Sequence, residues 1–129
     1  MIDVSCALII GHNGKILAAQ RSELMRLPLK WEFPGGKVEE NETAEGCIIR
    51  ELREELGVQV EILNSMVPAV HDDGNQQIRL IPFVCVITSG EITLAEHESY
   101  IWLSPADLND LDWAPADIPI VQQYLGSLS

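Results

Sequence analysis

The stretch from Thr43 to Gly57 carries the signals of a complete helix, including both of its ends. Thr43 suits the N-cap, because its hydroxyl can accept a hydrogen bond from a free backbone N–H of the first turn. Gly57 suits the position after the helix, where a left-handed residue closes the last turn. Between them, apolar side chains recur at helical spacing: Ile48, Ile49, Leu52 and Leu56. The chain therefore contains an amphipathic helix that must bury one face.

A second arc of the same helix is acidic. Glu51, Glu54 and Glu55 stand at i, i+3 and i+4, which are neighbouring positions on a helix surface, so their charges repel. One interpretation is a solvated acidic face, on which Arg50 and Arg53 partly offset the repulsion between the carboxylates. The other is a metal site, because Mg²⁺ prefers carboxylate and carbonyl oxygens and recruits substrate phosphates as further ligands. Two glycines shortly before the helix leave backbone carbonyls open to a cation, and we expect the metal site.

Strand-like runs and turn signals lie on both sides of this helix. A His-Asn-Gly sequence between the first two runs is a hairpin signal, and Pro82 in the longest run indicates a bulge or an irregular edge. The expected strands are Val4–Ile10, Lys15–Arg21, a strand or bent pair over Val58–Val70, Gln77–Thr88 and Tyr100–Leu103, and the expected helices start at Ser104 and span Asp117–Leu125. Strands on both sides of a helix, with helices last, predict an α+β fold in which a mixed sheet lies between helices.

The composition limits the class of partner. With 129 residues, the chain is expected to form one domain over 1–129. Its net charge of −12 argues against a nucleic-acid polymer, which needs clustered Lys and Arg, whereas a polyphosphate can bind when metal ions lie between. No apolar run spans a membrane and no signal peptide is present, which predicts a cytoplasmic protein without a membrane partner. The cysteines, Cys6, Cys47 and Cys85, lack zinc or disulfide spacing and are expected to be reduced core residues.

Residues 36–58 match the pattern Gly-x5-Glu-x7-Arg-Glu-U-x-Glu-Glu-x-Gly-U, in which U is aliphatic. A chance match is on the order of 10⁻⁹ per start position at ordinary residue frequencies. The pattern resembles the signature of the Nudix hydrolases, and similarity to their MutT-like branch runs over nearly the whole chain. Trp31–Lys37 looks like the segment that leads into the pattern in that branch. Segments that look most like the bacterial CTP pyrophosphohydrolases are Glu96–Glu98, Trp102–Pro105 and Ala114–Pro119. The resemblance implies the Nudix fold, an α/β/α sandwich with a central mixed β-sheet.

The resemblance also implies a set of site residues. The metal ligands would be the Gly35 carbonyl and the carboxylates of Glu51, Glu54, Glu55 and Glu96, the last as a ligand or a base. Supporting residues would be Gly36, Glu42 and Arg50, with Arg50 orienting a neighbouring carboxylate. Substrate contacts would come from Arg21, at phosphate or base, and from Phe33 and Asp117 at the base pocket.

The residues themselves leave alternatives open at several of these positions. The alternatives are a solvated loop carboxylate for Glu96, an exposed strand-end cation for Arg21, a core side chain for Phe33 and a helix cap for Asp117. His71 and His97 are expected at the surface, and neither has a second histidine nearby at the spacing of metal ligands.

The reaction implied by the resemblance is hydrolysis of a nucleoside triphosphate to the monophosphate and pyrophosphate, with Mg²⁺ or, in its place, Mn²⁺. Glu51 or Glu96 would act as general base.

In MutT an Asn that reads oxidised guanine stands where this chain has Asp117. An ionised carboxylate only accepts hydrogen bonds, which suits N4 of cytosine. The sequence thus favours (deoxy)cytidine triphosphates, including base-modified ones. The alternatives are an 8-oxo-dGTP diphosphatase that cleans the nucleotide pool and a non-catalytic nucleotide-binding regulatory module; the oligomeric state is not predicted.

Overall fold

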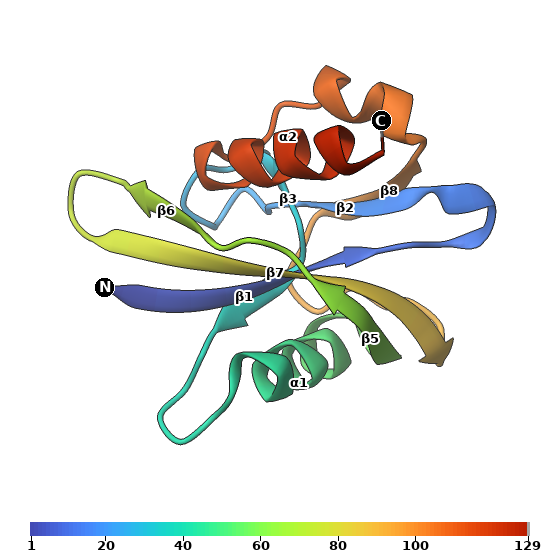
Figure 1. Cartoon of the computed structure of the whole chain (residues 1–129), viewed down its shortest axis with the longest axis horizontal. Helices are drawn as coiled ribbons and strands as arrows, with labels where there is room; N and C mark the ends of the chain where they lie inside the picture. Colours follow the sequence, from blue (N-terminus) through green and yellow to red (C-terminus); the bar gives the residue numbers. More distant parts are fainter. Residues whose placement is uncertain (129) are drawn as a thin grey trace.

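The computed structural model describes residues 1–128, and Figure 1 shows how its elements are arranged. The strands are β1 (Ile2–Ile9), β2 (Ile16–Gln20), β3 (Trp31–Glu32), β4 (Gly35–Lys37), β5 (Gln59–Ser65), β6 (Ala69–Asp72), β7 (Gln77–Ser89) and β8 (Ser99–Leu103). The helices are α1 (Ala44–Leu56) and α2 (Ile118–Ser127), with short 3₁₀ helices η1 (His12–Gly14), η2 (Pro105–Asp110) and η3 (Pro115–Asp117). Within residues 1–128, none of the helices has both the length and the apolar character needed to cross a membrane.

A five-stranded mixed sheet forms the centre of the molecule. β1 and β7 run parallel, β4 lies antiparallel on the other edge of β1, and β5 and β6 both pair antiparallel with β7. β5 ends with Ser65 opposite Phe83, and pairing resumes in β6 with Ala69 opposite Leu80. The interruption falls beside Pro82, which has no N–H to donate to a ladder. The predicted central strand, the bent pair and the irregularity at Pro82 are therefore confirmed.

A second, three-stranded sheet has the order β3-β2-β8 and is antiparallel. The expected hairpin between the first two strands exists only at its turn, where Ile10 bridges Ile16. Beyond that bridge the two strands separate, because both edges of β1 are already paired, with β4 and with β7. β2 therefore does not join the central sheet. It pairs instead with β3, close to the candidate site.

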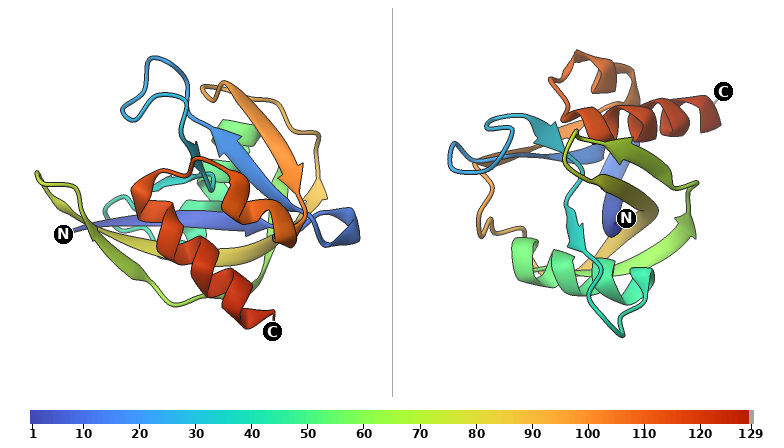
Figure 2. Two further views of the ribbon diagram at one scale, coloured as in Figure 1. Left: turned by 90° about the horizontal axis from the view of Figure 1, so that it is seen from above. Right: turned by 90° about the vertical axis from the view of Figure 1, so that its left-hand side faces the viewer.

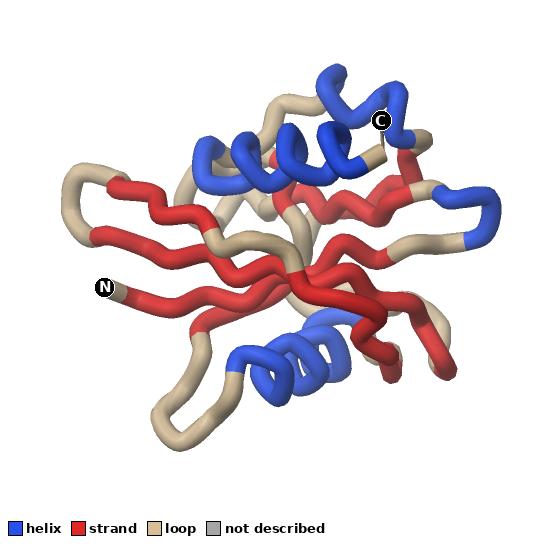
Figure 3. Tube along the Cα trace, in the orientation of Figure 1, coloured by secondary structure: helices blue, strands red, loops and turns tan. Residues whose placement is uncertain are grey.

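The two helices cover the sheets from opposite sides, α1 on one and α2 on the other (Figure 1; Figure 2, right). Figure 3 shows the strands of both sheets between these helices. Alternate residues of β1 face opposite layers: Cys6 and Leu8 join the cluster beside α2, and Ala7 and Ile9 join the cluster beside α1. The predicted α+β sandwich around a mixed sheet is confirmed. The cysteines are free and buried, as expected: Cys6, Cys47 and Cys85.

Both predicted ends of the acidic helix are present in α1. The Thr43 hydroxyl accepts a hydrogen bond from the Gly46 N–H at 3.0 Å. Gly57 has a φ of 72°, in the left-handed region, and its N–H donates to the Arg53 carbonyl.

Replacing Thr43 by Ala should lower the free energy of unfolding by about 1 kcal/mol, because the first turn loses its side-chain acceptor. Urea denaturation of the two proteins measures the difference. Thr43→Ser keeps the hydroxyl and should stay close to the wild type. An equal loss in the Ser and Ala variants would show that the methyl group, and not the cap, is responsible.

Candidate active site

The acidic side of α1 lies against the two glycines of β4. Gly35 stands opposite Cys6 of β1, and a Cβ at Gly35 would collide with the Ser5 carbonyl. A Cβ at Gly36 would overlap the carboxylate of Glu51. The glycine that opens the sequence pattern therefore leaves the space that the Glu51 carboxylate occupies.

Arg50 holds several of the carboxylates around it. Its Nε and Nη2 donate to the two oxygens of Glu42 at 2.7 and 2.9 Å. Its Nη1 donates to Glu51 at 2.9 Å and to Glu54 at 3.2 Å. The bonds from Arg50 lower the pKa of Glu42 to about 2, and the bond with Glu42 raises that of Arg50. The contact between Arg50 and a neighbouring carboxylate, which the resemblance implied, is thus present, and Glu42 is its bidentate partner.

Unlike Glu42, Glu55 has an unsatisfied carboxylate oxygen: its buried Oε2 has no hydrogen-bond partner. Burial, followed by the charge of Glu51, raises the pKa of Glu55 to about 9, with smaller contributions from the charges of Glu32 and Glu96. Glu96 therefore lies within electrostatic range of α1 although it is far along the chain. Glu54 is more exposed, with 58% of its side chain accessible. Glu51 and Glu55 are brought together, with Glu96 nearby and Glu54 at the rim.

The chemistry of these oxygen donors fits a hard divalent cation. A buried carboxylate oxygen without a partner is costly, and a cation would satisfy it. Among residues 1–128, no three Asp, Glu, His or Cys side chains converge on one point, and Arg50 pairs with Glu51 at 2.9 Å and with Glu54 at 3.2 Å. The chemical type of the donors, carboxylate and carbonyl oxygen, fits the metal that the resemblance implies, and the identity of each ligand stays a prediction.

A pocket of about 500 Å³ adjoins this acidic region. Gly35 lines it, and so do all three residues predicted to contact substrate: Arg21, Phe33 and Asp117. A volume of this size is in the range of small-molecule sites. The fold thus places the predicted substrate residues in one pocket, next to the predicted metal ligands.

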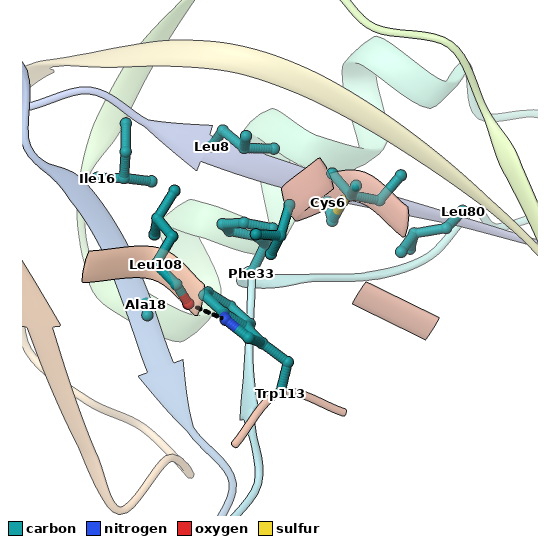
Figure 4. Packing of buried hydrophobic residues seen from close by; sticks show 10 residues of the cluster. Cys6, Leu8, Ile16, Ala18, Phe33, Leu80, Leu108 and Trp113 are labelled. Carbon is teal, nitrogen blue, oxygen red and sulfur yellow. Dashed lines mark hydrogen bonds between the residues drawn. The ribbon is translucent and has the colours of Figure 1, made fainter. Parts of the chain in front are cut away.

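Phe33 belongs to the core and to the pocket at once. Its ring packs on Trp113 with 4.7 Å between centroids, and the Trp113 Nε1 donates to the Leu108 carbonyl at 2.6 Å (Figure 4). The Phe33 N–H donates to Oδ1 of Asp117 at 3.0 Å. Asp117 precedes α2 but makes no side-chain capping bond, so the helix-cap interpretation is wrong. Burial raises the pKa of Asp117 to about 8.

Arg21 and a histidine are joined by a carboxylate that sequence reasoning did not identify. Glu32 accepts from Nη1 of Arg21 at 2.6 Å with one oxygen and pairs with Nε2 of His97 at 2.8 Å with the other. His97 is buried, so the expectation of a surface histidine is wrong there, whereas His71 lines the pocket half-buried. A signal was available: Glu32 stands directly before Phe33 in an apolar stretch, and a half-buried carboxylate needs partners.

A family model described as the NUDIX domain matches residues 1–124. The chain belongs to the NUDIX family. The CTP pyrophosphohydrolase of Escherichia coli K12 is 35% identical over 125 residues, which cover 97% of this chain and 92% of the relative. The 8-oxo-dGTP diphosphatase of the same strain is 28% identical over 120 residues, covering 93% of each.

Among solved structures, the MutT Nudix hydrolase from methicillin-resistant Staphylococcus aureus 252 is 45% identical, with a TM-score of 0.78, and the match covers 98% of this chain and 96% of that one. The resemblance to the Nudix hydrolases, and with it the class of enzyme, is confirmed. In this Nudix hydrolase the sequence pattern runs through β4, the following loop and α1, which explains why glycines and carboxylates recur at fixed spacing.

Proposed function

We propose that this Nudix hydrolase is a Mg²⁺-dependent nucleoside triphosphate pyrophosphohydrolase that prefers (deoxy)cytidine triphosphates, including base-modified ones. The observation that carries the proposal is the position of the pocket against the acidic side of α1. Gly35 lines the pocket, and the next residue, Gly36, lies under the carboxylate of Glu51. A nucleoside in the pocket would therefore present its phosphates to that carboxylate and its neighbours. The match to a CTP pyrophosphohydrolase along nearly its full length supports the same substrate class.

The residues that would hold Mg²⁺ are Gly35, through its carbonyl, and Glu51, Glu54, Glu55 and Glu96. When bound, the ion neutralises charge on the phosphates and lowers the pKa of bound water. The chain has a net charge of −12, so its own carboxylates would otherwise repel a triphosphate. Arg50 acts on this set by fixing Glu51 and Glu54 through its Nη1.

Hydrolysis requires a proton acceptor for the attacking water, and Glu51 or Glu96 would serve. As the water oxygen bonds to the β-phosphorus, its proton passes to the carboxylate. The bond from that phosphorus to the oxygen bridging the α-phosphate breaks, and the products are the nucleoside monophosphate and pyrophosphate. Glu51 is held by Arg50 at 2.9 Å, which fixes the orientation that a base requires.

Asp117 would read the base, and its burial changes the way it can do so. A pKa of about 8 means that the carboxyl carries a proton at neutral pH. Oδ1 already accepts from the Phe33 N–H, so the protonated oxygen can donate. A neutral carboxyl that both donates and accepts is complementary to N3 and N4 of cytosine. The same donor and acceptor pair is also complementary to O6 and N1 of guanine.

An 8-oxo-dGTP diphosphatase is accordingly the second candidate, supported by the E. coli relative of that name and by this complementarity to guanine. A non-catalytic nucleotide-binding regulatory module is the candidate of another class. It predicts nucleotide binding without turnover.

The test is pyrophosphate and phosphate release from a panel of NTPs, dNTPs and their oxidised or methylated forms, with Mg²⁺ or EDTA. We expect Mg²⁺-dependent pyrophosphate release that is fastest with cytosine nucleotides. Asp117→Ala should lower kcat/KM for them by about 10-fold or more, because a base-reading pair is worth ~1–3 kcal/mol. Fastest release from 8-oxo-dGTP would favour the second candidate, and binding without release would favour the regulatory module.

A further inference from the structure

The segment between β7 and β8 carries Glu96 without forming a helix or strand of its own. Before Glu96, the N–H of Ala95 donates to the Glu55 carbonyl at the end of α1, at 3.1 Å. After it, the N–H of Glu98 donates to the Gln20 carbonyl at the end of β2, at 2.9 Å. Glu96 thus lies on a short span between two backbone anchors on different elements.

His97 anchors this span by its side chain. Only 3% of that side chain is exposed, and its Nε2 lies 2.8 Å from Oε2 of Glu32. Burial pushes the pKa of Glu32 upward, but the bonds from His97 and Arg21 bring it below its ordinary value. Glu32 is therefore an anion at neutral pH, and Nε2 of His97 is the donor in this pair.

Packing alone does not account for an imidazole at this position. The Nδ1 atom of His97 is buried and has no hydrogen-bond partner. An apolar side chain of similar size would fill the same space without leaving a buried ring nitrogen unpaired. What the imidazole supplies, and an apolar side chain cannot, is the bond to Glu32.

We infer that His97 is a positioning residue, which holds Glu96 at the active site through its bond to Glu32. Glu96 is the neighbour of His97 in the chain, so fixing the imidazole fixes the backbone from which the Glu96 side chain departs. Glu32 and Arg21 both line the pocket, so the same chain of bonds joins the substrate pocket to the Glu96 segment. The inference rests on the proposed function in that Glu96 is taken to act in catalysis.

A double-mutant cycle separates positioning from a general structural role. The variants are Glu96→Gln, His97→Leu and the two combined, with His97→Gln as the conservative change. The readouts are kcat for pyrophosphate release from CTP and the dissociation constant for Mn²⁺, measured from free Mn²⁺ by electron paramagnetic resonance. The matched control is His12→Leu, which makes the same change on the exposed turn of η1.

We expect His97→Leu to lower kcat by about 10–100-fold with little change in KM, because a displaced catalytic group costs rate more than substrate binding. In the Glu96→Gln background the same change should cause no further loss. His97→Gln, which keeps a donor, should recover most of the activity, and His12→Leu should match the wild type. Non-additivity in either kcat or Mn²⁺ affinity supports the inference.

The inference is overturned if the losses from Glu96→Gln and His97→Leu multiply in both readouts, or if His97→Leu equals the wild type. A wild-type protein that releases no pyrophosphate from any nucleotide would overturn the proposed function instead. The Mn²⁺ cycle then decides alone whether His97 positions Glu96.

Discussion

Replacing Glu51 by Gln should lower kcat for nucleotide hydrolysis by about 10²–10⁴-fold, the range expected for losing a positioned proton acceptor. The Glu51 carboxylate lies in the space over Gly36, accepts a bond from Arg50 at 2.9 Å, and is close enough to Glu55 for its charge to raise the pKa of Glu55. Gln occupies the same volume but neither carries charge nor takes up a proton. Steady-state kinetics at saturating Mg²⁺ measures the loss.

The fold should survive this substitution, because it removes a charge from a crowded acidic group. The melting temperature without metal should therefore not fall. Glu45→Gln makes the same change on the exposed first turn of α1 and should leave kcat unaltered. A Glu51→Gln enzyme that keeps more than about a tenth of wild-type kcat would remove Glu51 from the catalytic group and leave Glu96 as the base.

Asp117→Asn should abolish one part of the dependence of stability on pH. The pKa of Asp117 is about 8 in the folded protein, against an ordinary value of 3.8, because the carboxyl is buried. The folded state therefore binds the proton more tightly than the unfolded state. The contribution of Asp117 to the free energy of unfolding is fully present below pH ~4. It is lost as the pH rises toward ~8, at a slope of at most ~1.4 kcal/mol per pH unit.

Asn keeps the shape of the side chain and can still accept from the Phe33 N–H, but it does not titrate in this range. The stability of the variant relative to the wild type should therefore increase as the pH rises from 5 to 8. Urea denaturation at each pH measures this difference, in which the titration of Glu55 cancels because both proteins contain it. Asp110→Asn, an exposed counterpart, should follow the wild type, and parallel curves for Asp117→Asn would refute the prediction.

Local signals predicted the acidic helix well. Thr43 and Gly57 form hydrogen bonds with backbone groups three or four residues away in the chain, so the two ends of α1 could be placed from sequence. The long strand, its irregularity at Pro82 and the buried cysteines also followed from short-range pattern. These features depend on neighbours within a few residues, which a sequence displays directly.

Features that depend on distant neighbours were not predictable in the same way. The separation of β1 from β2 follows from competition for strand edges, which only the assembled sheet reveals. The burial of His97 depends on Glu32, which lies 65 positions away in the sequence. Asp117 is protonated because the fold buries it. That burial cannot be read from neighbouring residues, so the sequence suggested an ionised carboxylate instead.

The parallel pairing of β1 with β7 also affects how the chain is made. Ile2 pairs with Ile78 and Ile9 with Cys85, so β1 cannot find this partner until β7 has left the ribosome. At about 5–20 residues per second, the apolar strand waits roughly 4–15 s with an open edge. Unpaired apolar strands are templates for aggregation. The yield of soluble enzyme in a cell should therefore depend on chaperones that cover β1 during that interval.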